Sequence, residues 1–183
     1  EERSRQTRRA REEELIEAPE LIEPFTIARD ELDPTRYFDT DYAFTLNHLA
    51  KEVLQTKNGI SLAELVADIG WQHNLARTTQ KQLDHIETII APWAGIATHA
   101  DGSKTVWATP DDVCDAISWR GVTAFGLPRD WSSLPYPERI GLAQYALAKD
   151  PDDAVGVIFA EFNLGRRTAS TKREFESWLA LAQ

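Results

Sequence analysis

The sequence predicts a mainly α-helical protein with a small β-hairpin, in which a winged helix-turn-helix-like unit is followed by a second, partly duplicated helical unit. Three observations predict this class. Two amphipathic helical segments joined by a turn lie within residues 61–91, a hairpin signal follows at residues 95–107, and residues 150–181 carry a second helical pair resembling the first. This order of elements is typical of a module that binds nucleic acid or docks on another protein.

The first helix is expected to run from about Thr40 to Thr56 and to stop at Asn58-Gly59. Its apolar stripe would pack under the helix pair that follows and comprises Tyr42, Leu46, Leu49 and Val53, with Phe44 nearby. In the next helix Ser61 is the expected N-cap, with Glu64 three residues on as in a capping box, and Gly70 is expected to end the helix.

The second helix of the pair opens at Thr78 or Thr79 and stops before Pro92, because proline cannot continue a helix. Residues 95–99 and 104–107 then read as two strands, and the Asp101-Gly102 pair between them favours a hairpin turn. A short helix is expected from Pro110 through Ile117, followed by an irregular connection up to residue 137.

The second half predicts three more helices: Pro137–Lys149, one capped by Asp150 or Asp152 and closed by Gly165, and a last one over Ala169–Leu181. It also suggests a duplication, with Gly70 and Gly165 as corresponding positions. Setting Thr79 on Thr171 brings Leu83 onto Phe175 and Ile86 onto Trp178.

Composition divides the chain into three parts. Residues 1–24 are expected to be a charged linker or solvated helix, because residues 1–17 contain five Arg and the run Glu12-Glu13-Glu14 with almost no apolar face. Residues 25–118 are expected to form the winged-helix-like domain, and residues 119–183 the second helical unit, which ends without room for a wing. The chain contains no methionine and begins inside a charged pattern, so we expect it to be a piece of a longer polypeptide.

Charge and cysteine content limit the possible functions. The formal net charge is −10, opposite to the basic balance of a protein that holds DNA by charge alone. The single cysteine excludes an internal disulfide and fits a reducing compartment. No apolar run approaches the roughly 18 residues of a membrane span. We therefore expect a cytoplasmic protein with no membrane partner.

Several stretches from about Asn47 to the C-terminus share a pattern with one protein family. They are Gly59-Ile60-Ser61-Leu62, Gly70, Arg77-Thr78, the Trp107 strand, Arg129-Asp130-Trp131-Ser132-Ser133-Leu134-Pro135 and Gly165-Arg166-Arg167-Thr168. The pattern resembles a C-terminal domain of unknown function in large bacterial superfamily 1 DNA helicase-like proteins, which often carry a restriction-endonuclease-like domain. The chain departs from it at Gln72-His73-Asn74-Leu75, which reads as an insertion.

The resemblance implies a non-catalytic accessory tail, whose parent protein would bind ATP and act as a DNA helicase and nuclease. If the first unit works as a winged helix, its second helix enters the major groove and the hairpin touches the neighbouring backbone. The expected DNA contacts are Arg77, Thr78, Thr79, Gln80, Lys81 and Lys104 in the first unit, and Arg166, Arg167, Lys172 and Arg173 in the second. The alternative for these residues is that they are solvated helix starts.

Signals for catalysis are weak, and we expect no enzyme activity, metal or cofactor in this chain. It contains no phosphate-binding loop, nucleophile elbow or zinc motif. His99 and Asp101 lie at the expected hairpin turn, where solvated polar residues are common, and Asp111 and Asp112 suit a helix start. Cys114 is expected to be a small buried residue. The six tryptophans are expected in the core, with Trp71 and Trp107 as the two whose exposure would matter for binding.

Two functions follow from these observations. The first is an accessory DNA-binding tail that guides DNA to a helicase or nuclease. The second is a protein-interaction module that docks on other domains of the same polypeptide or forms a homodimer, and the acidic net charge favours it. A positive stripe joining the two Arg-containing turns would support DNA binding, whereas an exposed apolar patch would support docking.

Overall fold

The computed structural model describes residues 32–126, 128–165 and 168–182, and the structural statements below concern these residues. The charged segment 1–24 lies outside them, as do Arg166 and Arg167. Within the described part, none of the helices has the length and apolar character needed to cross a bilayer.

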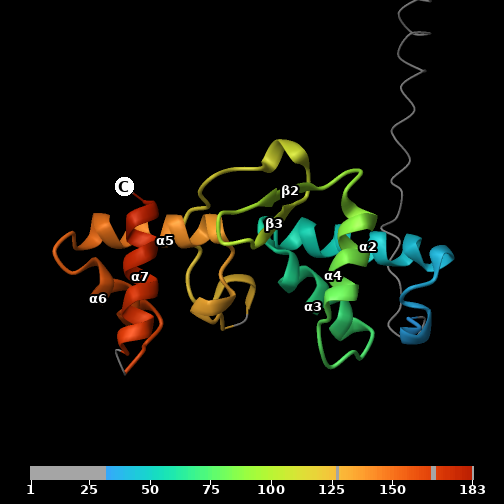
Figure 1. The fold of residues 1–183 in the computed structure, drawn as a ribbon, viewed down its shortest axis with the longest axis horizontal. Helices are drawn as coiled ribbons and strands as arrows, with labels where there is room; N and C mark the ends of the chain where they lie inside the picture. Colours follow the sequence, from blue (N-terminus) through green and yellow to red (C-terminus); the bar gives the residue numbers. More distant parts are fainter. Residues whose placement is uncertain (1–31, 127, 166–167, 183) are drawn as a thin grey trace, which may run out of the picture. The chain divides into compact units, whose positions relative to one another are not determined.

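The predicted fold class is confirmed, because the described chain is mainly helical with one small antiparallel sheet (Figure 1). The α-helices are α2 (Ala43–Thr56), α3 (Leu62–Gln72), α4 (Gln80–Ile90), α5 (Tyr136–Lys149), α6 (Ala154–Glu161) and α7 (Ala169–Leu181). The strands are β1 (Ile60–Ser61), β2 (Gly95–Thr98) and β3 (Lys104–Trp107).

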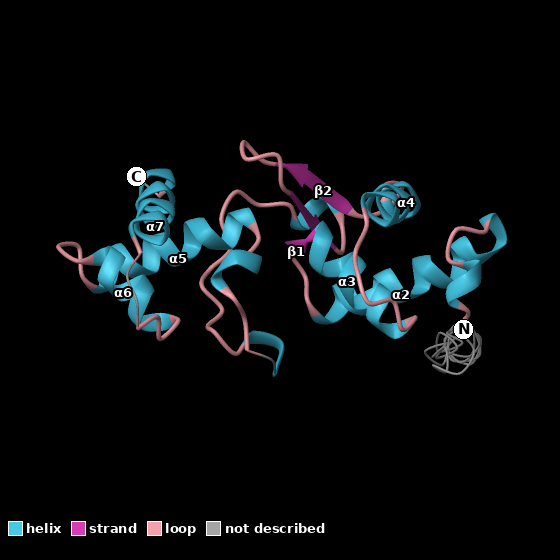
Figure 2. Cartoon of the chain, turned by 60° about the horizontal axis from the view of Figure 1, so that its bottom comes forward, coloured by secondary structure: helices cyan, strands magenta, loops and turns pink. Residues whose placement is uncertain are grey.

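The sheet contains a strand that the sequence did not indicate. β1 pairs antiparallel with β3, which places Ile60 opposite Val106, and the strand order is β1-β3-β2. Figure 2 shows this sheet beside the N-terminal end of α3. Gly59 leads into β1 with a φ of +72°, and a Cβ there would lie 3.0 Å from the indole nitrogen of Trp107, so the turn requires glycine. The hairpin is thereby anchored to the chain just before α3.

Two hydrophobic cores lie side by side along the chain. The first unites α2, α3, α4 and the sheet around the buried residues Leu46, Leu49, Leu65, Ile69, Ile86, Ile90 and Val106. The second unites α5, α6 and α7 around Leu142, Ala146, Ile158, Phe159, Phe175 and Trp178. Both cores follow the predicted helical periodicity, since the buried residues recur on one face of each helix.

The starts of α3 and α4 were predicted correctly, whereas α2 begins at Ala43, after a 3-10 turn over Thr40–Tyr42, and not at Thr40. Ser61 Oγ accepts a hydrogen bond from the Glu64 amide at 3.1 Å, although the Glu64 carboxylate does not return it. Thr79 caps α4, and Gln82 completes a capping box by accepting from the Thr79 amide at 2.7 Å. The short helix expected through Ile117 is instead a single 3-10 turn over Pro110–Asp112.

The sequence predicted that α3 ends at Gly70. This was wrong, because the helix continues to Gln72. The chain turns at Asn74, whose φ is +56°, and the Leu75 amide donates to the Gly70 carbonyl at 2.8 Å. This is a Schellman motif with asparagine in the left-handed position. Asparagine tolerates that conformation better than other side chains, so it can replace the expected glycine.

The same turn recurs after α6. Asn163 has a φ of +49°, and the Leu164 amide donates to the Phe159 carbonyl at 3.0 Å. α6 is capped by Asp153, whose carboxylate accepts from the Gly156 amide at 3.0 Å, and not by Asp150 or Asp152 as expected. Gly165 lies beyond the turn and does not form it.

These turns correct the alignment of the two halves. Asn74 corresponds to Asn163, and the N-cap of α4, Thr79, corresponds to Thr168, the N-cap of α7, rather than to Thr171. Ile86 and Phe175, both fully buried, then occupy equivalent positions. The stretch Gln72–Leu75 needs no insertion, because Glu161–Leu164 matches it residue by residue.

Three side chains, those of Phe44, Cys114 and Trp71, are more exposed than expected. Phe44 is 70% exposed and does not pack under the helix pair. Cys114 is exposed rather than buried, because it follows the single 3-10 turn and no helix there packs it inward. Trp107 is buried at 2% exposure, whereas Trp71 is 66% exposed.

A pair of buried tyrosines provides a test of the first core. Tyr42 Oη accepts from the Asp33 amide at 3.1 Å and lies 3.0 Å from His73 Nε2, while His73 Nδ1 contacts the Ile69 carbonyl at 2.8 Å. A carbonyl only accepts, so Nδ1 carries the proton of the neutral ring and Nε2 accepts from Tyr42. The Tyr37 hydroxyl is buried with no hydrogen-bond partner among the described residues, and burial raises its pKa.

We expect Tyr37→Phe to raise the free energy of unfolding by about 1 kcal/mol and Tyr42→Phe to lower it by about 1–3 kcal/mol, because only the second change leaves a buried polar atom unpaired. Urea denaturation followed by tryptophan fluorescence measures both. Equal effects of the two substitutions would contradict this description of the core.

Candidate functional site

The expected DNA-contact residues of the first unit lie at the turn between α3 and α4 and on the first turn of α4. Arg77, Thr78, Thr79, Gln80 and Lys81 are all exposed there. Thr79 is occupied by the capping box, and Gln80 Nε2 donates to the Asp84 carboxylate at 2.8 Å. Among the described residues, the Arg77 and Thr78 side chains form no hydrogen bond or ion pair.

The basic residues of α4 and the hairpin are held by other groups of the chain. The Lys81 ammonium lies 4.0 Å from the centroid of the Phe38 ring, a cation–π contact. Lys104, the expected contact of the wing, donates to both oxygens of Glu87 at 2.6 and 2.7 Å. Together with Asp84, Glu87 makes the face of α4 beyond its first turn acidic rather than basic.

The hairpin turn is docked on the start of α5. The His99 ring stacks on Tyr136 with centroids 4.6 Å apart and an interplanar angle of 8°, and Arg139 donates to Asp101 at 2.9 Å. Burial lowers the pKa of His99, which favours the neutral ring in this stack. Burial would raise the pKa of Asp101, but hydrogen bonds from Ser103 and the charge of Arg139 outweigh it and lower that pKa.

No group of three potential metal-ligating side chains that could hold an ion occurs among the described residues. His99 and Asp101 serve instead as contacts between the hairpin and α5.

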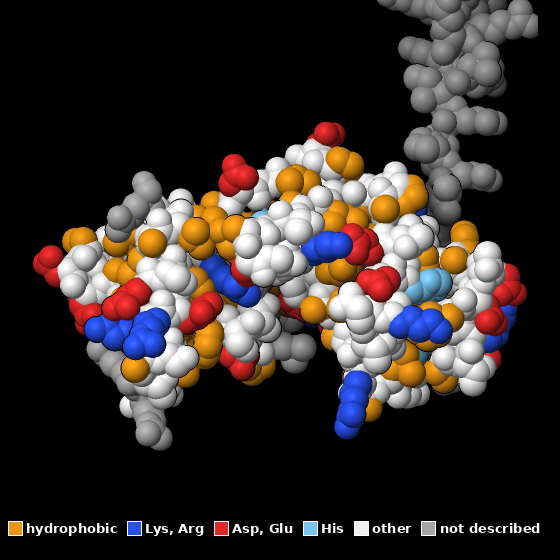
Figure 3. Space-filling model, viewed as in Figure 1, with side chains coloured by type: hydrophobic (Ala, Val, Ile, Leu, Met, Phe, Trp, Pro, Cys, Tyr) orange, Lys and Arg blue, Asp and Glu red, His pale blue; other side chains and the backbone are white. Residues whose placement is uncertain are grey.

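In the second unit, Lys172 and Arg173 are exposed on the first turns of α7, and Thr168 caps this helix by accepting from the Thr171 amide at 3.2 Å. Lys172 forms an exposed ion pair with Glu176 at 3.6 Å. In the face shown in Figure 3, the Lys and Arg side chains lie in separate groups with Asp and Glu among them. This face carries no continuous positive stripe.

A cleft of about 650 Å³ lies between α3, residues 124–125 and 128–135, and the start of α5. Its lining residues are Lys57, Ser61, Ala63, Glu64, Ala67, Asp68, Ser103, Ala124, Phe125, Pro128, Arg129, Asp130, Ser132, Ser133, Leu134, Pro135 and Arg139. The lining combines alanine, proline and aromatic surface with charged side chains at the edges, as is common in binding clefts.

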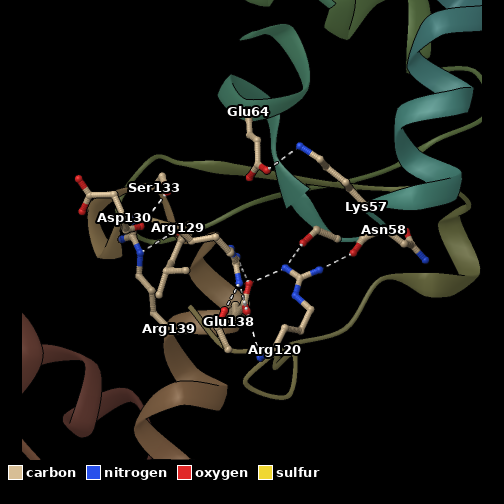
Figure 4. Close-up of polar contacts among 12 residues, drawn as sticks. Lys57, Asn58, Glu64, Arg120, Arg129, Asp130, Ser133, Glu138 and Arg139 are labelled. Carbon is tan, nitrogen blue, oxygen red and sulfur yellow. Dashed lines mark hydrogen bonds and ion pairs between the residues drawn. The ribbon is translucent and has the colours of Figure 1, made fainter. Parts of the chain in front are cut away.

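A buried ionic group, which we call the Glu138 cluster (Arg120, Arg129 and Glu138), supports the floor of this cleft (Figure 4). Glu138 is fully buried in the first turn of α5, and both guanidinium groups donate to it, with Arg129 Nη1 at 2.6 Å from Oε1. Burial would raise the pKa of Glu138, but the hydrogen bonds from Arg129 and Arg120 lower it below its ordinary value. Arg120 also donates to the carbonyls of Asn58 and Gly59 at 2.8 and 3.0 Å, which ties α5 to the start of β1.

Lys57 also lines the cleft, and its side chain pairs with carboxylates of α3. Its ammonium lies 2.8 Å from Asp68 and 3.6 Å from Glu64, so one cation serves two carboxylates on the same face of α3. Burial raises the pKa of Glu64 despite this neighbour. Figure 4 shows Lys57 extending toward Glu64 while the Glu138 cluster lies apart from them.

Comparison with known proteins identifies no relative, since no family model, curated protein or solved structure matches this chain.

The sequence did not single out the Glu138 cluster or the cleft. One of its residues, Arg129, belongs to the Arg129–Pro135 stretch that carries the family resemblance, and this was the available signal. Arg120 and Glu138 are ordinary charged residues in the sequence. Glu138 is bonded to residues 9 and 18 positions away, and Arg120 also reaches a carbonyl 62 positions away.

Proposed function

We propose that this chain is a non-catalytic protein-interaction module, made of a winged-helix-like unit and a second three-helix unit. The order helix, strand, helix, helix and hairpin supports the winged-helix assignment, as does the pairing of the edge strand β1 with β3 of the hairpin. The observation that carries the functional proposal is the docking of the hairpin turn on α5 through His99 and Asp101.

This docking opposes the usual use of a wing on DNA. For the hairpin to follow a phosphate backbone, the Asp101–Arg139 pair and the His99–Tyr136 stack would have to be released. Phosphate binding also requires cations that are free to replace counterions, whereas Lys104 is paired with Glu87. The net charge of −10 adds a general repulsion.

Exposed aromatic side chains support docking on protein. Phe44 and Trp71 are 70% and 66% exposed, and large aromatic residues are enriched at protein interfaces. The partner would be another domain of the same polypeptide or a second copy of the chain.

DNA binding is the second candidate, and one observation favours it. The turns that end α3 and α6 share a left-handed asparagine, and exposed basic side chains follow both in the chain, Arg77 after the first and Lys172 and Arg173 after the second. These residues and the resemblance to helicase tails keep an accessory role on DNA open to test.

Fluorescence anisotropy with labelled duplex, forked and single-stranded DNA at low salt separates the two candidates. We expect no binding tighter than about 10⁻⁴ M, the weak end of non-specific binding, because the basic side chains are few and partly paired. Tighter binding that falls with salt and is lost in Arg77→Glu and in Lys172→Glu/Arg173→Glu would establish the DNA candidate and overturn the proposal.

The positive test is a selection of binders from a random peptide library against the intact chain, together with sedimentation equilibrium. We expect either peptides that bind reproducibly in solution or a concentration-dependent dimer. A chain that stays monomeric and yields no binder would contradict the protein-interaction proposal.

A further inference from the structure

One face of α3 carries exposed apolar side chains. Ala63, Ala67 and Trp71, spaced four residues apart, are all exposed, while Leu65 and Ile69 on the opposite face are fully buried. Residues four apart lie above one another on a helix, so these three form one stripe. Alanine permits close approach of another main chain, and the tryptophan offers a large contact area.

This stripe lines two adjoining hollows. The cleft of about 650 Å³ at the N-terminal end of α3 and a hollow of about 320 Å³ around Trp71 share Ala67 and Asp68. Phe125, Pro128, Leu134 and Pro135 face the stripe across the larger cleft. From Ala63 to Trp71 the helix rises about 12 Å, which is enough to seat two turns of a helix or a few residues of extended chain.

The charges along this groove favour a basic occupant. Glu64 and Asp68 share one ammonium, that of Lys57, and Asp130 lies on the facing wall with no ion pair within the described structure. On the facing wall Arg129 shares the carboxylate of Glu138 with Arg120, and Arg139 pairs with Asp101. Arg77 marks the far end of the hollow, beyond Trp71.

The half-buried carboxylate of Glu64 is the group that would gain most from an additional cation. Its side chain is 22% exposed and its nearest cation is 3.6 Å away, so it lacks the solvation of a surface carboxylate. A guanidinium or ammonium group entering the cleft would supply a second cation to the Glu64–Asp68 pair, whereas an anion would meet two carboxylates.

We propose that the groove along α3 is the docking surface of this module, and that its occupant is a segment of a partner protein that combines apolar residues with a Lys or Arg side chain directed at Glu64 and Asp68. This assignment rests on the proposed function. It commits to a basic, apolar peptide segment and excludes nucleic acid, whose phosphates the carboxylates would repel.

The test uses peptides selected against the intact chain, with affinities measured by fluorescence anisotropy. We expect the selected peptides to be enriched in apolar residues and Lys or Arg, and Ala67→Arg to weaken their binding at least tenfold, because it fills the groove and adds a like charge. The matched control is Ala160→Arg, the same change at an exposed alanine of α6 outside the groove, which should leave binding unchanged. Ala63→Arg is a second groove variant, and circular dichroism verifies folding of each.

A charge test completes the assignment. Glu64→Gln/Asp68→Asn should weaken the basic peptides and reduce the salt dependence of their binding. Binders that tolerate Ala67→Arg and Ala63→Arg would overturn the groove assignment and leave the protein-interaction proposal standing. Groove binders without cationic residues would overturn the proposed chemistry, and the absence of any binder in a monomeric chain would overturn the proposed function itself.

Discussion

Replacement of Glu138 by alanine is expected to lower the free energy of unfolding by about 3–5 kcal/mol, the usual cost of removing one partner from a buried ionic group. The change leaves two guanidinium groups facing each other, and the Arg129 side chain is only 7% exposed. It also releases Arg120, which joins the start of α5 to the main chain before β1. Urea denaturation measured by circular dichroism at neutral pH gives the value directly.

The matched control is Glu176→Ala, which removes the exposed partner of Lys172 and should change stability by less than about 0.5 kcal/mol. A loss below about 1 kcal/mol for Glu138→Ala would show that the Glu138 cluster does not hold the two cores together.

The same carboxylate gives a pH dependence whose sign follows from its lowered pKa. Because the folded state holds Glu138 ionised more strongly than the unfolded state does, its stabilisation is complete above the unfolded pKa of about 4.3 and is lost as the pH falls through the lower folded pKa. The wild-type chain should therefore lose more stability than Glu138→Gln between about pH 5 and pH 3. Parallel stability profiles for the two proteins would contradict this.

The second large effect is expected at Gly141 in α5. A Cβ at this position would lie 1.8 Å from the carbonyl oxygen of Ile117, where the connection between the two cores crosses the helix. Gly141→Ala should therefore lower the free energy of unfolding by about 3 kcal/mol, at the upper end of the usual cost of overpacking, despite the better helix propensity of alanine. Thermal and urea denaturation measure this change.

Gly70→Ala is the control, because Gly70 is also a buried helical glycine but its Cβ would meet only the Cβ of Leu75 at an ordinary 3.7 Å. There the gain in helix propensity should prevail and stabilise the protein by roughly 0.5–1 kcal/mol. Similar effects of the two substitutions, in either direction, would show that the close approach at Gly141 is not maintained in solution.

Local signals predicted much of the fold. The last helix was predicted with its correct bounds, Ala169–Leu181, and α4 with its cap at Thr79, because amphipathic periodicity and capping side chains are encoded within a few residues. The hairpin followed from Asp101-Gly102 for the same reason. The predicted end of α3 was wrong, because the sequence favoured Gly70 as the stop, whereas Asn74 makes the left-handed turn.

Long-range contacts explain what the sequence did not reveal. β1 is two residues long and exists through its pairing with Val106 and Thr105, so it has no periodicity of its own. The docking of Asp101 on Arg139 and of Arg120 on the Asn58 carbonyl joins residues 38 and 62 positions apart. The charge composition predicts repulsion between this chain and DNA, and this stays a prediction.

The position of Glu138 has a consequence for the order of events during synthesis. All residues of the first core up to Val106 leave the ribosome before Arg120, Arg129 and Glu138 do, so that core can assemble while translation continues. Arg120 and Arg129 then emerge without their shared counter-charge and stay hydrated until α5 follows. Nascent chains that stop short of residue 138 would thus carry a folded N-terminal half and an untethered tail.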